Sequence, residues 1–336
     1  ISNSSQIKGI FNPTAFQEIN GLILKVFSNT LPLVRVLQKF LVENSEMENS
    51  NSTTSLLSIV KICIHSLSML LKTNIQKLDD ISDESEFDLL LSNLLSFLQT
   101  SASYPYSLDY FSSSKQIIFY DIFLPLLIEN TLSLEDISDN PVQFANAALQ
   151  FSLGDGSDET SYKGNLKKAI AKFSRFVDGF LSFSVQFTIQ VLDFIFEGCP
   201  VDKFASQFSL VKEAEQSNFI LHANSDQKIE SGLLLLTILN IEIKERKDLL
   251  VLFQSFFFKN ADIIVRTVQS ELIKIRFLNL YFSFKNHLSY QKDDDNNEYL
   301  NRIHLWILSQ IQGNDALSLI AVQVVTDLIK EKKQIN

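Results

Sequence analysis

The sequence predicts an all-α protein, and three observations lead to that fold class. The 336 residues include only 9 glycines and 6 prolines, fewer than the many turns of a β-sandwich or β-barrel require. Apolar residues recur at steps of three and four along most of the chain, which is the spacing of an amphipathic helix. No segment alternates convincingly between apolar and polar residues, as a half-buried strand does.

The first half of the chain alternates between helical segments and polar loops. Apolar residues at helical spacing predict helices at 14–27, 31–41, 55–71, 83–98, 117–128 and 140–149. Segments 44–54, 101–109 and 152–165 are polar and are expected to be loops or connectors.

Single residues refine three of these helices. Asp83 and Glu86 have the spacing of a capping box. Pro125 lies inside the apolar run 117–128, and it should kink that helix because proline removes one backbone hydrogen bond. Pro141 suits the first turn of its helix, and Val142 is expected on the apolar face of that helix.

The second half continues the pattern and adds a repeat. Helices are predicted at 166–180, 183–196, 204–221, 226–240, 248–259, 271–288, 298–312 and 315–330. Gly232, Phe277 and Ala321 occupy corresponding places in three similar segments and are separated by 45 and 44 residues. HEAT-type helix pairs have this period, and each pair needs its neighbours to bury its apolar face. We therefore expect residues 1–336 to form a right-handed α-solenoid of HEAT-type antiparallel helix pairs.

Charge is distributed unevenly along the chain. Its net charge is −10; residues 1–160 carry 8 basic and 19 acidic side chains, and residues 161–336 carry 21 basic and 20 acidic ones. An acidic first half repels nucleic acid and attracts basic proteins, although ordinary solvated loops explain the same excess.

The chain contains no targeting or membrane-spanning segment that its sequence reveals. It opens at Ile1 without a signal peptide, so we expect it to be an internal part of a longer protein. The run 117–128 is short for a bilayer span and includes Asp121 and Pro125, which favours a core helix. Cys63 and Cys199 form no disulfide framework and no zinc pattern, which favours a reducing compartment.

Motifs for catalysis, cofactors and metals are missing, so we expect no enzyme activity, no cofactor and no metal site. Segment 293–298 resembles a calcium loop, but Glu298 stands at the position of the sharp-turn glycine, so a solvated acidic loop is predicted. The four histidines lack clustered co-ligands and are expected to be ordinary helix residues. The aromatic segments 256–258 and 281–282 are expected in the core, although binding of Phe-Gly peptides is the alternative.

A series of motifs in the middle of the chain resembles a known family. Ile-Phe-Leu-Pro-Leu-Leu at 122–127 is followed by Leu-Glu-Asp at 134–136, Asn-Pro-Val-Gln-Phe at 140–144 and a basic, alanine-containing helix at 166–173. This order resembles the importin-β superfamily, in the branch of the importin-seven-type and CAS-type karyopherins. Segments 228–239 and 270–276 resemble later helices of that family, so the resemblance covers about residues 110–330. Gln143 stands where the family usually has Glu, and Lys167 and Lys168 replace arginines.

The resemblance implies a nuclear transport receptor that carries protein cargo through the nuclear pore under the control of the Ran GTPase. It implies shuttling between cytoplasm and nucleus, binding to Phe-Gly nucleoporins, and Ran contacts that lie largely outside this segment. Direct binding of nucleic acid and insertion into a membrane are not expected. Residues 1–110 are then more divergent acidic repeats, and 111–336 correspond to the middle region of the family.

The acidic residues of the loops are the candidate contacts for a basic cargo, because family members often use acidic side chains on a concave face. These candidates are Glu135, Asp136, Asp139, Asp155, Asp158 and Glu159. A solvated loop is the alternative explanation for each of them. The alternative function is a HEAT-type scaffold subunit of another assembly, such as a vesicle coat or a complex-assembly factor.

Overall fold

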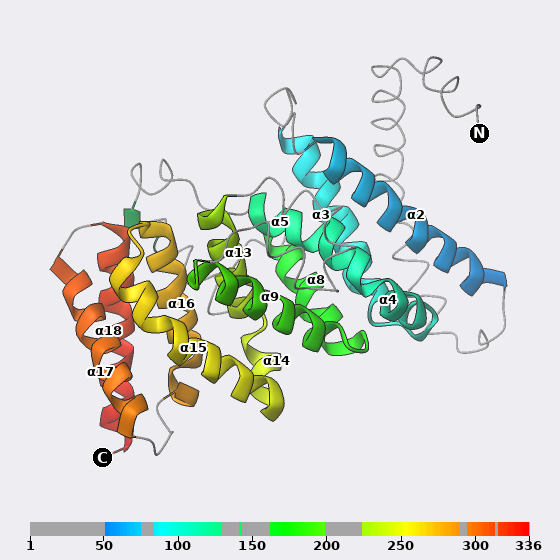
Figure 1. Ribbon diagram of the computed structural model, residues 1–336. Coiled ribbons are helices and arrows are strands. Elements are labelled where there is room, and N and C mark those ends of the chain that lie inside the picture. Colours follow the sequence, from blue (N-terminus) through cyan, green and yellow to red (C-terminus); the bar gives the residue numbers. More distant parts are fainter. Residues whose placement is uncertain are drawn as a thin grey trace. The chain divides into compact units, whose positions relative to one another are not determined.

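The computed structural model describes residues 51–74, 84–129, 141–142, 145, 162–198, 224–288, 294–312 and 315–335 (Figure 1). Every regular element in these ranges is a helix, which confirms the all-α prediction for them. The helices predicted at 14–27, 31–41 and 204–221 lie outside the described residues, and so does Asp83 of the predicted capping box.

The chain divides into two compact units. The first comprises Ile1–Asp109 with Thr160–Ala169, and the second comprises Tyr110–Glu159 with Ile170–Asn336. Each unit is described by itself below. The single array predicted for residues 1–336, with a change of character near residue 110, stays a prediction.

Two leucine-rich helices pack together in the first unit. They are α2, Asn51–Asn74, and α3, Glu84–Ser101. The apolar residues at helical spacing are buried as predicted; they include Leu56, Val60, Cys63, Leu67, Leu91, Leu94, Leu95 and Leu98. Helix α2 begins at Asn51, a few residues before the predicted start. The Asn165 side chain donates hydrogen bonds to the hydroxyl and carbonyl oxygens of Ser92 on α3, at 2.7 and 3.3 Å.

The apolar run around Pro125 belongs to three consecutive helices: α4, Pro105–Ile118; η3, the π-helix Phe119–Phe123; and α5, Leu124–Glu129. The predicted connector 101–109 is wrong from residue 105 onward. Pro105 begins α4 because its fixed φ suits a first helical turn, where its missing N–H costs nothing.

The kink expected at Pro125 takes the form of a π-helical turn. The N–H of Leu124 donates to the carbonyl oxygen of Phe119, five residues earlier. A proline ring within an α-helix clashes with the carbonyl group four residues before it, which here belongs to Asp121. The wider π-turn lies at that place, so the backbone accommodates the proline without ending the helix.

Aromatic rings surround this run in the second unit. Phe119 makes edge contacts with Phe180, Phe183 and Phe187, with ring centroids 6.1, 5.5 and 5.6 Å apart. Phe123 contacts Phe173 and Phe180 in the same way, at 5.1 and 5.7 Å. Edge-to-face packing of this kind adds to the free energy gained from burial alone.

Among the described residues, one helix, 105–128, is long and apolar enough to cross a membrane. A second span is counted if the bent pair of helices 164–176 and 180–196 is treated as one. Most of residues 118–127 are buried among other helices of the protein. A core helix has this property, as the sequence predicted for the run 117–128.

A glycine separates the next two helices, α8, Tyr162–Phe176, and α9, Phe180–Phe196. The predicted boundary at residues 180–183 is wrong, because the break lies at 177–179, where Gly179 has a φ of 68°. A side chain is strained at such a φ, and a Cβ there would also lie 2.5 Å from the Nζ of Lys115. Lys115 donates to the carbonyl oxygen of Asp178 at 3.1 Å.

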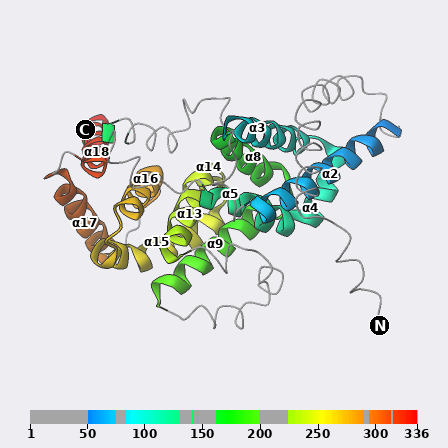
Figure 2. The same cartoon turned by 90° about the horizontal axis from the view of Figure 1, so that it is seen from above.

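The C-terminal helices of the second unit lie in two rows (Figure 2). Their bounds are α13, Ser225–Ile238; α14, Asn240–Glu245; α15, Lys247–Thr267; α16, Glu271–Leu288; α17, Asp294–Ser309; η4, Gln310–Gln312; and α18, Ala316–Ile335. One row contains α9, α15 and α17, in which each helix packs against the next. The other row contains α5, α13, α16 and α18, also packed in that order. Contacts between α9 and α13, α15 and α16, and α17 and α18 join the rows.

The three repeated segments fall on neighbouring helices of one row. Gly232, Phe277 and Ala321 lie on α13, α16 and α18, and all three are buried. The 45-residue and 44-residue separations therefore correspond to one step along this row.

Several local predictions need correction. The predicted acidic loop 293–298 is helical from Asp294 onward, since these residues form the start of α17. Val142 is 56 % exposed, so it does not lie on a buried apolar face. Helix α15 continues to Thr267, well past the predicted end at 259. Helix α13 has an unpredicted capping box, in which Asn224 and Gln227 exchange hydrogen bonds of 2.8 and 3.0 Å.

Gly232 allows α13 to approach α9 closely, and a substitution at this position tests the contact. A Cβ at this position would lie 3.0 to 3.1 Å from three side-chain carbons of Leu192. Gly232→Leu should lower the free energy of unfolding by about 1–3 kcal/mol, because the added side chain overpacks the contact between the helices. Chemical denaturation measures this change.

The matched control is Leu192→Ala, alone and combined with Gly232→Leu. The truncated side chain leaves room for the new one, so the double variant should be more stable than the sum of the single effects predicts. Simple additivity would contradict the close contact between α13 and α9.

Candidate functional site

The six acidic residues proposed from the sequence as cargo contacts lie outside the described residues. Glu135, Asp136, Asp139, Asp155, Asp158 and Glu159 therefore stay predictions. Among the polar groups that the structure does place, some join neighbouring helices and others lie on an exposed surface.

A buried ion pair joins two helices of the same row. Arg276 on α16 donates from Nε to the Oε1 of Glu230 on α13 at 3.2 Å, and both side chains are about 95 % buried. Burial lowers the pKa of the Arg276 guanidinium from its ordinary value, and the carboxylate of Glu230 opposes that shift. Because an isolated buried charge is costly, each group requires the other.

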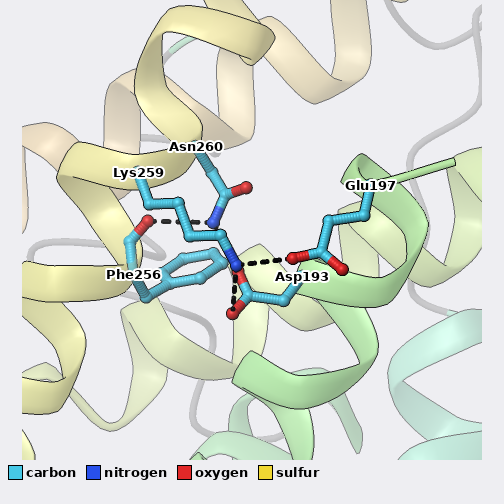
Figure 3. Close-up of polar contacts among 5 residues, drawn as sticks. All are labelled: Asp193, Glu197, Phe256, Lys259 and Asn260. Carbon is cyan, nitrogen blue, oxygen red and sulfur yellow. Dashed lines mark hydrogen bonds and ion pairs between the residues drawn. The ribbon is translucent and has the colours of Figure 1, made fainter.

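A half-exposed polar cluster joins two helices of the other row (Figure 3). The Nζ of Lys259 on α15 lies 2.7 Å from Glu197, next to the end of α9, and 3.2 Å from Asp193 on α9. Asn260 donates to Asp193 at 2.6 Å and to the carbonyl oxygen of Phe256 at 3.0 Å. The hydrogen bond to Glu197 is the largest cause that raises the pKa of Lys259. The cluster fixes α9 against α15.

The same row has a second ionic link, between α15 and α17. Arg302 on α17 pairs with Glu298 one turn away and lies 3.6 Å from Asp262 on α15, which also binds Arg266 at 3.0 Å. Between α16 and α17, the hydroxyl of Tyr281 and the Nε2 of His304 share a hydrogen bond of 2.6 Å. The Arg302–Asp262 and Tyr281–His304 contacts each connect neighbouring helices, which is a structural role.

An exposed surface that combines aromatic and basic groups lies where α8 meets α14. Arg175 donates to the buried Glu242 at 3.0 Å and is itself 52 % exposed. Phe176, next in the chain, is 42 % exposed, and the ammonium of Lys172 lies 5.1 Å from its ring centroid. Ile241, which precedes Glu242 in the chain, is also exposed. We name Lys172, Arg175 and Phe176 the α8–α14 patch. Exposed aromatic groups and arginine are typical of protein interfaces.

The titratable groups of the described residues include a buried cysteine and a partly buried histidine whose pKa values are shifted. Burial raises the pKa of the Cys63 thiol to about 12, which makes this cysteine a poor nucleophile. Burial and then the nearby Lys244 lower the pKa of His287. Among the described residues, no group of three or more His, Cys, Asp or Glu side chains is arranged to hold a metal ion.

The aromatic segments examined for Phe-Gly binding are in the core. Phe256, Phe257 and Phe258 are buried, and so are Tyr281 and Phe282. The Phe257 and Phe277 rings stack at 5.4 Å, which links α15 to α16. The prediction of core packing is confirmed for these five rings.

Sequence reasoning missed the buried pair and the α8–α14 patch. Glu230 and Arg276 are 46 residues apart, about one repeat, so the period itself contained a signal for the pair. For the patch, the signal was weaker. Segment 162–176 contains five basic residues and no acidic one, which predicts a basic amphipathic helix but does not show that α14 packs beside it.

No protein family, curated protein or solved structure matches this chain.

The buried pair gives a quantitative prediction. Arg276→Met should destabilise the protein by about 3–5 kcal/mol, because it removes the guanidinium that pairs with the buried carboxylate of Glu230. The double variant Glu230→Met/Arg276→Met should be more stable than the single variant, since it removes both charges. Equilibrium denaturation with urea measures both values.

Lys259→Met is the matched control for that experiment. Its ion pairs with Asp193 and Glu197 are half-exposed, so the loss should be under about 1 kcal/mol. Equal losses for the two single variants would contradict the difference in burial.

The start of α16 gives a prediction about pH. Burial and then the nearby Asp315 raise the pKa of Glu271 above its ordinary value. A carboxyl whose pKa is raised in the folded state stabilises it at low pH, and this contribution is lost as the pH rises through the folded pKa. Glu271→Gln should therefore be more stable than the parent at pH 7, by less than about 1 kcal/mol, and equally stable near pH 4.

Thermal unfolding across this pH range provides the measurement. Glu245→Gln, an exposed change on α14, serves as the control and should not alter the pH dependence. A Glu271→Gln curve parallel to that of the parent would contradict the raised pKa.

Proposed function

We propose that this chain is a non-catalytic helical scaffold that binds other proteins through its surface. We infer that its two rows of helices are part of a right-handed α-solenoid of HEAT-type pairs. The observation that supports this most strongly is the position of the repeats: equivalent residues on α13, α16 and α18 lie on successive helices of one row. Such arrays typically function as extended binding surfaces.

The polar contacts fit the same proposal. The ion pairs of Arg276 and Lys259 connect one helix to the next within a row. These groups hold the array together, and other surfaces remain to bind a partner. The α8–α14 patch is one such surface, because Phe176 is exposed and the ammonium of Lys172 lies over its ring.

In its specific form, the proposal is a nuclear transport receptor that carries protein cargo under Ran control. The support for this form is the resemblance to karyopherins over about residues 110–330, together with the proposed solenoid. The acidic residues of segments 135–139 and 155–159 are then the contacts for a basic cargo, and Ran binds outside this segment. The alternative is a scaffold subunit of another assembly, which the two rows of helices support equally well.

A binding experiment separates the two forms. If the protein is a transport receptor, the longest natural polypeptide that contains this chain should bind Ran loaded with GTP, more weakly Ran loaded with GDP, and Phe-Gly nucleoporin repeats. Affinity capture with purified proteins measures these interactions. Binding to neither Ran nor nucleoporin would remove the transport function and leave the scaffold.

Charge reversal tests the acidic contacts separately. Changing Glu135, Asp136 and Asp139 to lysine should weaken binding to a basic nuclear-localisation peptide about tenfold or more, because opposite charges at an interface are replaced by like charges. Binding to the parent should also fall steeply between 50 and 300 mM salt, roughly as expected from screening. Reversal of Glu245 and Asp248 on and beside α14 is the matched control, and equal effects would exclude a specific acidic site.

A further inference from the structure

The α8–α14 patch contains a cation that a buried group holds in place. The side chain of Arg175 is 52 % exposed, whereas the side chain of its partner, Glu242 on α14, is only 5 % exposed. The Nη2 of Arg175 donates to the Oε1 of Glu242 at 3.0 Å. Because a buried carboxylate that loses its partner is costly, this pair keeps the guanidinium at one place on the surface.

Most of the hydrogen-bonding capacity of this guanidinium is left for a ligand. A guanidinium has five N–H groups, and among the described residues Arg175 makes one hydrogen bond, to Glu242. Two parallel N–H groups of a guanidinium match the two oxygens of a carboxylate. Since Glu242 already fixes its position, Arg175 loses little side-chain freedom when it binds such a group.

An aromatic ring and a second cation lie next to Arg175. Phe176 follows it in the chain and is 42 % exposed, and the Nζ of Lys172 lies 5.1 Å from the centroid of the Phe176 ring. Among the described residues, no carboxylate pairs with Lys172. The patch therefore offers apolar contact area and two positive charges side by side.

The charges of the chain limit which partner the patch fits. Binding of nucleic acid requires many contacts to phosphates, whereas the patch has two cations, and the exposed Asp178 follows Phe176 by two residues. The whole chain carries a net charge of −10, which repels a long polyanion. A short segment with one or two carboxylates beside an apolar side chain matches the patch in both charge and size.

We infer that the α8–α14 patch binds a short acidic segment of a partner protein. One carboxylate of the segment binds the guanidinium of Arg175, a second pairs with Lys172, and an apolar side chain between them packs on the exposed part of the Phe176 ring. The inference rests on the proposed function, the binding of other proteins through the surface, and it names the chemistry of one partner. This site is separate from the acidic loop residues proposed to bind a basic cargo.

Fluorescence anisotropy of a labelled peptide, Glu-Asp-Leu-Glu-Asp-Phe with blocked ends, mixed with the 336-residue chain tests the inference. We expect a dissociation constant of roughly 10–100 µM, since the contact is much smaller than a standard interface. The matched peptide with Gln and Asn in place of its acidic residues should bind about tenfold more weakly, because it lacks the charge-assisted hydrogen bonds.

Two variants test the cations of the patch. Lys172→Glu should weaken binding of the acidic peptide about tenfold, because it replaces an attraction by a repulsion. Arg175→Lys should weaken it about fivefold, because lysine keeps a charge for Glu242 but lacks the planar fork of N–H groups that matches a carboxylate.

A third variant, Phe176→Ser, removes the apolar contact and should weaken binding about fivefold. Leu305→Ser on α17 and Lys330→Glu on α18 are matched controls, since both positions are exposed and lie outside the patch. Both controls should bind the acidic peptide as the parent does. Circular dichroism and thermal unfolding confirm that each variant remains folded.

Binding that the three patch variants weaken and the two controls leave unchanged supports the inference. No binding of the acidic peptide overturns it, and so does binding that the patch variants do not weaken. Tighter binding of a single-stranded oligothymidylate, weakened by the same variants, also overturns it, because the partner is then a nucleic acid. Capture of Ran, nucleoporin and the basic peptide is measured separately, so failure of this inference is distinguishable from failure of the proposed function.

Discussion

The need to cover both sides of each helix determines the structure of the second unit. Helix α16 shows this most clearly: Phe277 faces α15 and α17 through ring contacts with Phe257 and Trp306, while Ile275 and Leu278 are buried on another face. A helix that is apolar on several faces gains little from folding alone, because it buries its surface only between neighbours. Each helix of the row therefore stabilises the next, as expected for a repeat array.

Polar contacts determine which helices become neighbours. Apolar faces are interchangeable, whereas a buried Arg276 requires an acidic partner at one defined place, and Glu230 supplies it. The cluster of Asp193, Lys259 and Asn260 has the same effect in the other row, at lower cost because it is half-exposed. Apolar burial thus supplies most of the stability, and the ion pairs select the arrangement of the helices.

Apolar spacing predicted the cores of the helices well and their ends poorly. Leu94 and Leu278 are each buried because a period of 3.6 residues places them on the same face as the other apolar residues of their own helix. Predicting that face requires only the local sequence. The helix start at Pro105 and the helix break at Gly179 were not predicted, because proline or glycine can begin a helix or interrupt one. Which of the two occurs depends on φ and on the neighbouring side chains. Lys115 bonds to Asp178, and Arg175 bonds to Glu242, across 63 and 67 residues of sequence. Spacing within one helix therefore held no information about these contacts. The acidic candidates lie outside the described residues, and the transport function stays a proposal.

The dependence of each helix on its neighbours also connects the fold to its interactions. Within the row, Glu230, Leu233, Ile275 and Leu278 are buried. Leu319 and Val322, one period later on α18, are exposed. The α8–α14 patch arises differently, since Arg175 is held by Glu242 and the adjoining Phe176 is left in solvent. In the scaffold that we propose, this patch of aromatic and basic side chains suits a partner of opposite charge.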